Sequence, residues 1–148
     1  MNFDELRRRL IAKLPFYASI INSVQIMETD IMTPVVATNG KDIYYNPKAL
    51  KTLTADQILF AFANAICHIG FNDVTRMEGK NALVWNIATD AVINDFLRKD
   101  GFTDIEKSVN IPDASSLNAE DLYNQLMDEV KKTGRVQTSE EDIVRVEL

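Results

Sequence analysis

One apolar segment of this 148-residue chain contains its only histidine, His68. Asn64 precedes His68 by four residues and Asn72 follows it by four, so a regular helix would place the three side chains on one face. Zinc hydrolases place two metal-binding histidines at this spacing, with a glutamate beside the first that acts as general base. Here the first histidine position holds an asparagine, and the base position holds Ala65.

These substitutions argue against hydrolysis by the common two-histidine mechanism. Ala65 cannot accept a proton from a bound water, and an amide is a poor zinc ligand. An alternative is a rearranged site with His68, Asp73 and Asp90 as ligands, because imidazole and carboxylate groups suit several divalent ions. Asp73 lies about 140° round a regular helix from His68, so it joins only if the helix bends or ends near Gly70. We favour a hydrogen-bonded histidine without a metal.

A second polar stripe follows on the next expected helix. Asn86, Asp90 and Asn94 are spaced by four residues and share one helix face. They either line the same cleft as His68 or form a hydrogen-bond network between helices, and we favour the network because buried polar groups need partners. Trp85 is expected in the core or in a cleft wall.

Two more residues near His68 have chemical potential. Arg76 either pairs with a cleft carboxylate such as Asp90 or lies at the end of its helix, where its charge favours the helix dipole. Cys67 has apolar neighbours and no nearby cation in the sequence, so we expect a buried structural thiol.

Tyr44 and Tyr45 are adjacent in an expected strand, so one faces the core and the other faces outward. If that strand is a sheet edge, it offers a surface to which an extended peptide can add as a further strand. Such a surface does not depend on a metal.

Helices are expected where apolar residues recur at helical spacing, over residues 2–14, 54–77, 81–98 and 118–132. Pro15 ends the first of these, and a short helical piece follows over residues 16–23. Thr54 and Gln57 form a capping-box pattern at the start of the second. Gly101 is a stop signal after the third.

The strands are expected before the long helices. Residues 24–28 alternate and include β-branched side chains, and residues 34–46 form a hairpin about the Asn39-Gly40 turn. The order is helix, strand, hairpin and three helices. It predicts an α+β domain with a small antiparallel sheet or hairpin packed on about four to five helices.

Composition excludes several classes. The length suits one domain, and the net charge of −6, from 22 acidic and 16 basic residues, disfavours a nucleic-acid partner. The single cysteine cannot form an internal disulfide. The N-terminus lacks the basic and apolar regions of a signal peptide, and no apolar run approaches the ~20 residues of a membrane span. We therefore expect a soluble, cytoplasmic protein without a membrane partner.

Four stretches carry a resemblance to a known family: VATNGKDIYYNP (36–47), LTADQILFAFANAICHIGFNDVTR (53–76), VWNIATDAVIND (84–95) and VNIPDASSLNAEDLYNQL (109–126). They resemble the metallopeptidase domain that usually stands N-terminal to a VWA-like domain in bacterial and phage proteins. The most specific part is WNIATDAVIN. The resemblance implies a metallopeptidase-like domain with a zincin-like core over residues 1–132, followed by a polar C-terminal tail over residues 133–148.

The resemblance also implies where the family's H-E-x-x-H motif falls. Its first histidine falls on Asn64, its glutamate on Ala65, its second histidine on His68 and a further histidine on Asp73, while its helical aspartate is kept as Asp90. This degenerate motif implies the fold but argues against peptidase activity. We expect no catalytic residue and no cofactor, with zinc or another divalent ion only at the rearranged site.

Three hypotheses follow. The first is a catalytically inactive domain that binds a protein or peptide. Its partner would be a peptide, a second copy, a VWA-domain protein or a MoxR-type AAA+ ATPase, with which such families are often encoded. The second is a metal-dependent hydrolase with the rearranged site, and the third is a structural or oligomerisation module. We favour the first.

Overall fold

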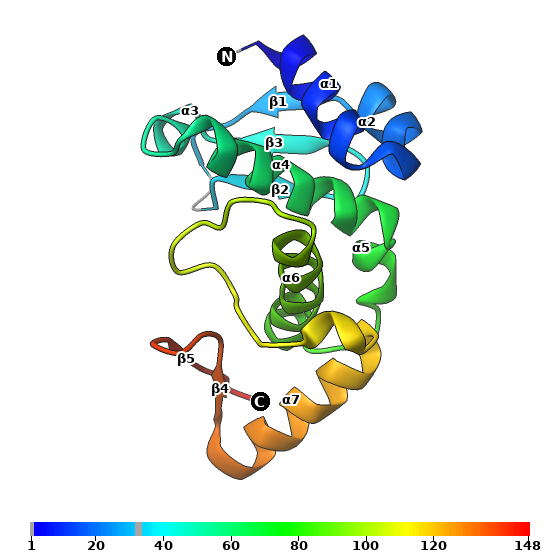
Figure 1. Cartoon of the computed structure of the whole chain (residues 1–148). Coiled ribbons are helices and arrows are strands. Elements are labelled where there is room, and N and C mark those ends of the chain that lie inside the picture. The colour runs from blue at the N-terminus through cyan, green and yellow to red at the C-terminus, as the bar shows by residue number, and fades with distance from the viewer. Residues whose placement is uncertain (1, 32–33) are drawn as a thin grey trace. The chain divides into compact units, whose positions relative to one another are not determined.

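The structure is a computed structural model that describes residues 2–31 and 34–148 (Figure 1). It is α+β, as predicted, whereas the finer expectation of a zincin-like core stays a prediction. The chain divides into two compact units where the length suggested one domain. They are the N-terminal unit, Met1–Arg76, and the C-terminal unit, Met77–Leu148. Each is described by itself.

The N-terminal unit combines several helices with a short sheet. The helices are α1 (Phe3–Lys13), η1 (Pro15–Tyr17), α2 (Ala18–Ser23), α3 (Pro47–Leu50), α4 (Ala55–Gly70) and α5 (Asp73–Arg76). The break at Pro15 and the short helical piece after it are as predicted. The predicted capping box is also present, because Thr54 and Gln57 exchange bonds between side chain and backbone.

The sheet is mixed rather than wholly antiparallel. Its order is β1 (Ile26–Glu28), β3 (Ile43–Tyr45), β2 (Val36–Thr38), which makes β3 the central strand. β2 and β3 form the predicted antiparallel hairpin, and Gly40 adopts φ 95° in its turn. β1 pairs with β3 in parallel, which corrects the prediction. The sequence pattern identifies a strand, but it does not identify the strand's partner.

α4 is the central helix of the N-terminal unit. It lies against β2, α1 and α2 (Figure 1), and Phe62 and Ile66 on it are fully buried. The predicted helix to residue 77 is too long, because α4 ends at Gly70 and only the short α5 follows.

The C-terminal unit combines two long helices with a hairpin. Its elements are α6 (Ala82–Lys99), η2 (Ala114–Ser116), α7 (Ala119–Thr133), β4 (Arg135–Gln137) and β5 (Ile143–Arg145). α6 and α7 are preceded by the N-cap residues Asn81 and Asn118, whose side chains accept a bond from a backbone N–H of the first turn.

Residues 133–148, expected as a polar tail, contain the antiparallel pair β4 and β5. Val136 is fully buried and Val146 is 6% exposed, and both belong to the apolar core formed with α6 and α7. Two buried β-branched side chains, one in β4 and one directly after β5, hold this segment in place despite its acidic composition.

Arg98 fixes the long connection between α6 and η2. Its guanidinium donates to both carboxylate oxygens of Asp104, at 2.8 and 3.1 Å, to the hydroxyl of Ser108 at 3.0 Å and to the carbonyl of Val109 at 2.9 Å. Burial opposes ionisation of Asp104, but the bonds from Arg98 and Ser108 outweigh it and lower the pKa of the carboxyl group.

Asp95 ties α6 to η2 and was missed by the sequence analysis. Its Oδ2 accepts from the Ser115 hydroxyl at 2.6 Å and backbone N–H at 3.0 Å, and lies 3.0 Å from the Lys99 ammonium. Burial opposes the charge, but the bonds from Ser115 and Lys99 outweigh it, so the pKa of Asp95 is lower than usual.

Asp95→Asn is expected to lower the free energy of unfolding at pH 7 by about 1–2 kcal/mol, because a charged hydrogen-bond acceptor is lost. A carboxyl with a lowered folded pKa stabilises the fold above the unfolded pKa of about 3.9, and this contribution disappears as the pH falls through the folded value. Urea unfolding at pH 7, 4 and 3 should therefore show a weaker acid dependence in the variant. The control is Asp128→Asn, at an exposed position of α7. An unchanged acid dependence in Asp95→Asn would contradict the prediction.

Across the described residues, no helix is both long and apolar enough to cross a membrane.

Candidate functional site

The end of α4 is closed by a tight turn at Phe71 and Asn72. The N–H of Phe71 donates to the carbonyl of Cys67 at 2.8 Å, and the N–H of Asn72 donates to the carbonyl of Ile69 at 3.0 Å. Asn72 adopts φ 58°, a left-handed conformation that asparagine tolerates better than most residues. This turn brings the start of α5 back beside the last turn of α4.

A polar cluster results, formed by His68, Asp73 and Arg76 and called here the α4–α5 cluster. The His68 Nδ1 lies 2.9 Å from Asp73 Oδ2, and the Arg76 Nη1 lies 3.3 Å from Asp73 Oδ1. Arg76 also donates to the carbonyl of Phe71 at 2.9 Å. Asp73 is only 4% exposed, so its charge is neutralised inside the unit rather than by water.

The structure tests the predictions for Asp73, Arg76 and Asn72. The sequence analysis expected Asp73 to reach His68 only if the helix bends or ends near Gly70. The helix does end at Gly70, and the two side chains are in contact. Arg76 both pairs with a carboxylate, Asp73, and satisfies a carbonyl at the end of α4. The predicted place of Asn72 on the helix face is wrong, because this residue lies after the helix and is exposed.

The positions before His68 provide no acid or base. Asn64 is half-buried, and Ala65 is 1% exposed with only a methyl group. Cys67 is fully buried, as predicted.

Tyr17 adjoins this region and was missed by the sequence analysis. Burial, with smaller contributions from Cys67 and Asp73, raises the pKa of its phenol to about 12. A Cβ atom added at Gly70 would stand 2.4 Å from Cζ of the Tyr17 ring, so the ring packs directly on the helix backbone. A glycine inside an apolar helical segment was the available signal, since it permits close approach of another group.

Tyr44 and Tyr45 do not form the peptide-binding edge considered above. They lie on β3, which has a strand on each side, so a peptide cannot add there. The Tyr44 hydroxyl accepts from the Asn39 amide at 3.2 Å, and the Tyr45 ring lies 5.4 Å from that of Phe3.

The predicted site residues of α6 lie in the C-terminal unit and in different environments. Asn86 is exposed, Asp90 is half-buried and Asn94 is 3% exposed, with its amide donating to the carbonyl of Val109 at 3.2 Å. The expected buried network along this stripe is therefore wrong for Asn86. Trp85 is a core residue, with the Tyr123 ring 6.0 Å away.

The α4–α5 cluster does not have the ligands that zinc requires. Zinc sites in proteins use three or four imidazole, thiolate or carboxylate ligands. Within residues 2–31 and 34–148, no group of three or more such side chains is arranged to hold a metal ion. His68 and Asp73 are hydrogen-bonded to each other, and the four-residue partner of His68 is an amide.

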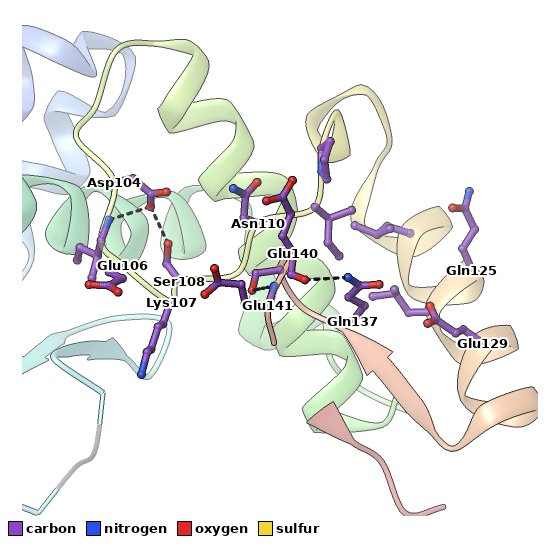
Figure 2. Close-up of a pocket in the computed structure, with 16 residues that line it drawn as sticks. Asp104, Glu106, Lys107, Ser108, Asn110, Gln125, Glu129, Gln137, Glu140 and Glu141 are labelled. Carbon is purple, nitrogen blue, oxygen red and sulfur yellow. Dashed lines mark hydrogen bonds between the residues drawn. The ribbon is translucent and has the colours of Figure 1, made fainter. Parts of the chain in front are cut away.

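A pocket of about 790 Å³ lies in the C-terminal unit (Figure 2). Its walls are the connection over residues 104–112, one side of α7 and the turn between β4 and β5 over residues 137–141. The sequence analysis missed this pocket because its walls come from three separate segments, one of which was expected as a polar tail.

A family model with the description "Putative metallopeptidase domain" matches residues 2–145 of this chain. No curated protein and no solved structure gives a significant match. The matched segment includes both units and extends beyond the resemblance of the four stretches, through the C-terminal hairpin.

Proposed function

We propose, since this chain belongs to the family described as "Putative metallopeptidase domain", that it is a catalytically inactive member that binds a protein or peptide. The observation that carries the proposal is Ala65. This residue stands where the resemblance implies the general base, and its methyl group is 1% exposed. A buried methyl group supplies no proton acceptor.

The contacts of His68 support a structural role. In zinc sites a carboxylate commonly accepts from the second nitrogen of a ligating histidine and orients the ring. Asp73 has this relation to His68 at 2.9 Å, but Asn64 replaces the second histidine. In our proposal the α4–α5 cluster therefore closes the end of α4 and holds no metal.

The binding half of the proposal is supported by the pocket of the C-terminal unit. A concave site of about 790 Å³ lies within the range of proteins' ligand sites, roughly 300–1,000 Å³. A MoxR-type AAA+ ATPase or a VWA-domain protein as partner follows only from the resemblance.

The direct test is peptide hydrolysis by the purified full chain, with zinc added or chelated. We expect no zinc-dependent rate above background. A zinc-dependent rate that His68→Ala abolishes would overturn the proposal in favour of the rearranged hydrolase.

Asn64→His is expected to create a weak zinc site with two histidine ligands, completed by water, where the natural sequence has one histidine. The variant places two histidines four residues apart on α4, and ligand binding to the folded state stabilises it. At a zinc concentration ten times the Kd, the free energy of unfolding should rise by about 1.4 kcal/mol. Thermal unfolding with and without zinc measures this.

The double variant Asn64→His/His68→Ala is the matched control, and it should not respond to zinc. Stabilisation of the unmodified chain by zinc, lost in His68→Ala, would contradict the prediction. That result would show that the natural residues already hold a metal.

A further inference from the structure

The pocket of the C-terminal unit is lined by apolar side chains, called here the apolar floor, and by acidic side chains. Its apolar lining residues are Ile105, Ile111, Pro112, Leu122 and Leu126. Its acidic lining residues are Asp104, Glu106, Glu129, Glu140 and Glu141. Lys107 is the one basic residue among the described residues that line it.

The acidic residues come from all three walls. Figure 2 shows Glu140 and Glu141 between the connection that carries Glu106 and the helix α7 that carries Glu129. Asp104 is paired with Arg98, whereas these four glutamates are exposed. Like charges gathered around one cavity repel each other, and a bound cation relieves that repulsion.

We infer that this pocket docks a basic segment of a partner protein, with an apolar side chain on the floor and lysine or arginine residues against the four glutamates. The inference rests on the proposed binding function and names its surface and the chemistry of its partner. The four glutamates attract lysine and arginine residues of the partner, because the charges are opposite. The apolar floor favours an apolar side chain between these basic residues, because burying it removes apolar surface from water.

Other occupants fit less well. A divalent cation lacks a suitable ligand set, because the described residues contain no group of three carboxylates arranged to hold one. A second copy of this chain is acidic overall, with a net charge of −6, and would add to the repulsion. A small polyamine would leave the apolar floor exposed to water.

The wall over residues 104–112 is already fixed by the bonds from Arg98 to Asp104, Ser108 and Val109. A partner segment would therefore enter a formed site and would not have to order this wall on binding. This observation favours a short linear segment as the occupant, because ordering the segment already costs entropy and a preformed wall adds little further ordering cost.

The test uses the full chain and a fluorescein-labelled probe peptide, Gly-Lys-Arg-Leu-Phe-Arg-Lys-Gly, in a fluorescence-polarisation titration at two salt concentrations. Two further probes separate the contributions, one with glutamate in place of each basic residue and one with serine in place of Leu-Phe. We expect the first probe to bind at least ten-fold more tightly than either of the others, and binding to weaken in high salt.

Variants locate the site. Glu140→Gln/Glu141→Gln and Gln125→Arg should each weaken binding of the first probe about ten-fold, because each removes negative charge or adds positive charge at exposed pocket positions. Asp128→Asn is the matched control on α7, outside the pocket lining, and should leave the affinity within two-fold. Circular dichroism checks that each variant is folded.

Several results would overturn the inference. They are equal affinity for the serine probe, unchanged affinity in the pocket variants, or a concentration-dependent dimer whose formation the probe blocks. Zinc-dependent hydrolysis with intact probe binding would instead refute the inactive assignment alone. Probe binding that fails while hydrolysis stays absent would refute the docking surface alone.

Discussion

Asp73→Ala should lower the free energy of unfolding by about 3 kcal/mol, the low end of the cost of removing one partner from a buried ion pair. The carboxylate of Asp73 contacts both His68 and Arg76 and is 4% exposed. Its removal leaves these two donors with fewer partners in a region with little water. Arg76 is about one-third exposed and can partly turn to solvent, which keeps the cost near 3 rather than 5 kcal/mol.

Urea unfolding followed by circular dichroism measures this loss. A double-mutant cycle with His68→Ala isolates the contribution of the His68–Asp73 pair, and we expect a coupling of about 1 kcal/mol or more. The exposed carboxylate Asp121 of α7 offers a control, since Asp121→Ala should change stability far less. A loss below 1 kcal/mol for Asp73→Ala would show that the α4–α5 cluster does not stabilise the turn.

Gly70→Ala should destabilise the protein by about 2 kcal/mol, within the usual cost of overpacking. The added Cβ would lie 2.4 Å from Cζ and 2.5 Å from Cε1 of the Tyr17 ring. The ring is itself held against Phe71, with 6.3 Å between the ring centroids, so it cannot move away without losing that contact. Helix propensity alone predicts the opposite sign, a gain of about 1 kcal/mol for alanine over glycine.

The same substitution in a Tyr17→Ala background separates these two effects. Without the ring, Gly70→Ala should cost little or stabilise the helix, so the two substitutions should couple by about 2 kcal/mol. Thermal and urea unfolding of the four proteins measure the coupling. Stabilisation by Gly70→Ala in the natural sequence would contradict the close packing of Tyr17.

Local signals predicted much of this fold. The Thr54 capping box, the Asn39-Gly40 turn and the break at Pro15 all depend on residues close in the sequence. Such features depend on few neighbours, so residue type and spacing suffice to identify them.

Contacts between segments far apart in the sequence were harder to predict. The parallel partner of β1 depends on residues 43–45, and no local pattern distinguishes that pairing from an antiparallel one. The C-terminal hairpin was interpreted as a polar tail because its segment is rich in acidic residues. Its valines Val136, Val144 and Val146 nevertheless alternate with polar residues, as in a half-buried strand. Their burial against α6 and α7 decides the outcome.

The candidate site was predicted in part. The meeting of His68 and Asp73 followed from helix geometry once Gly70 was considered as an end. The contact of Tyr17 with that end joins residues over fifty positions apart, which spacing along one helix cannot reveal. The pocket could not be predicted either, because its walls come from three segments that are separate in the sequence.

The Arg98 anchor has a consequence for the speed of recognition. Because the wall over residues 104–112 is held by four bonds from one guanidinium, the docking that we infer would not require this wall to rearrange. Association would then be governed by diffusion and by the attraction between opposite charges. Partners that share a basic character would arrive at similar rates, and their residence times would depend on how well one apolar side chain fits the floor.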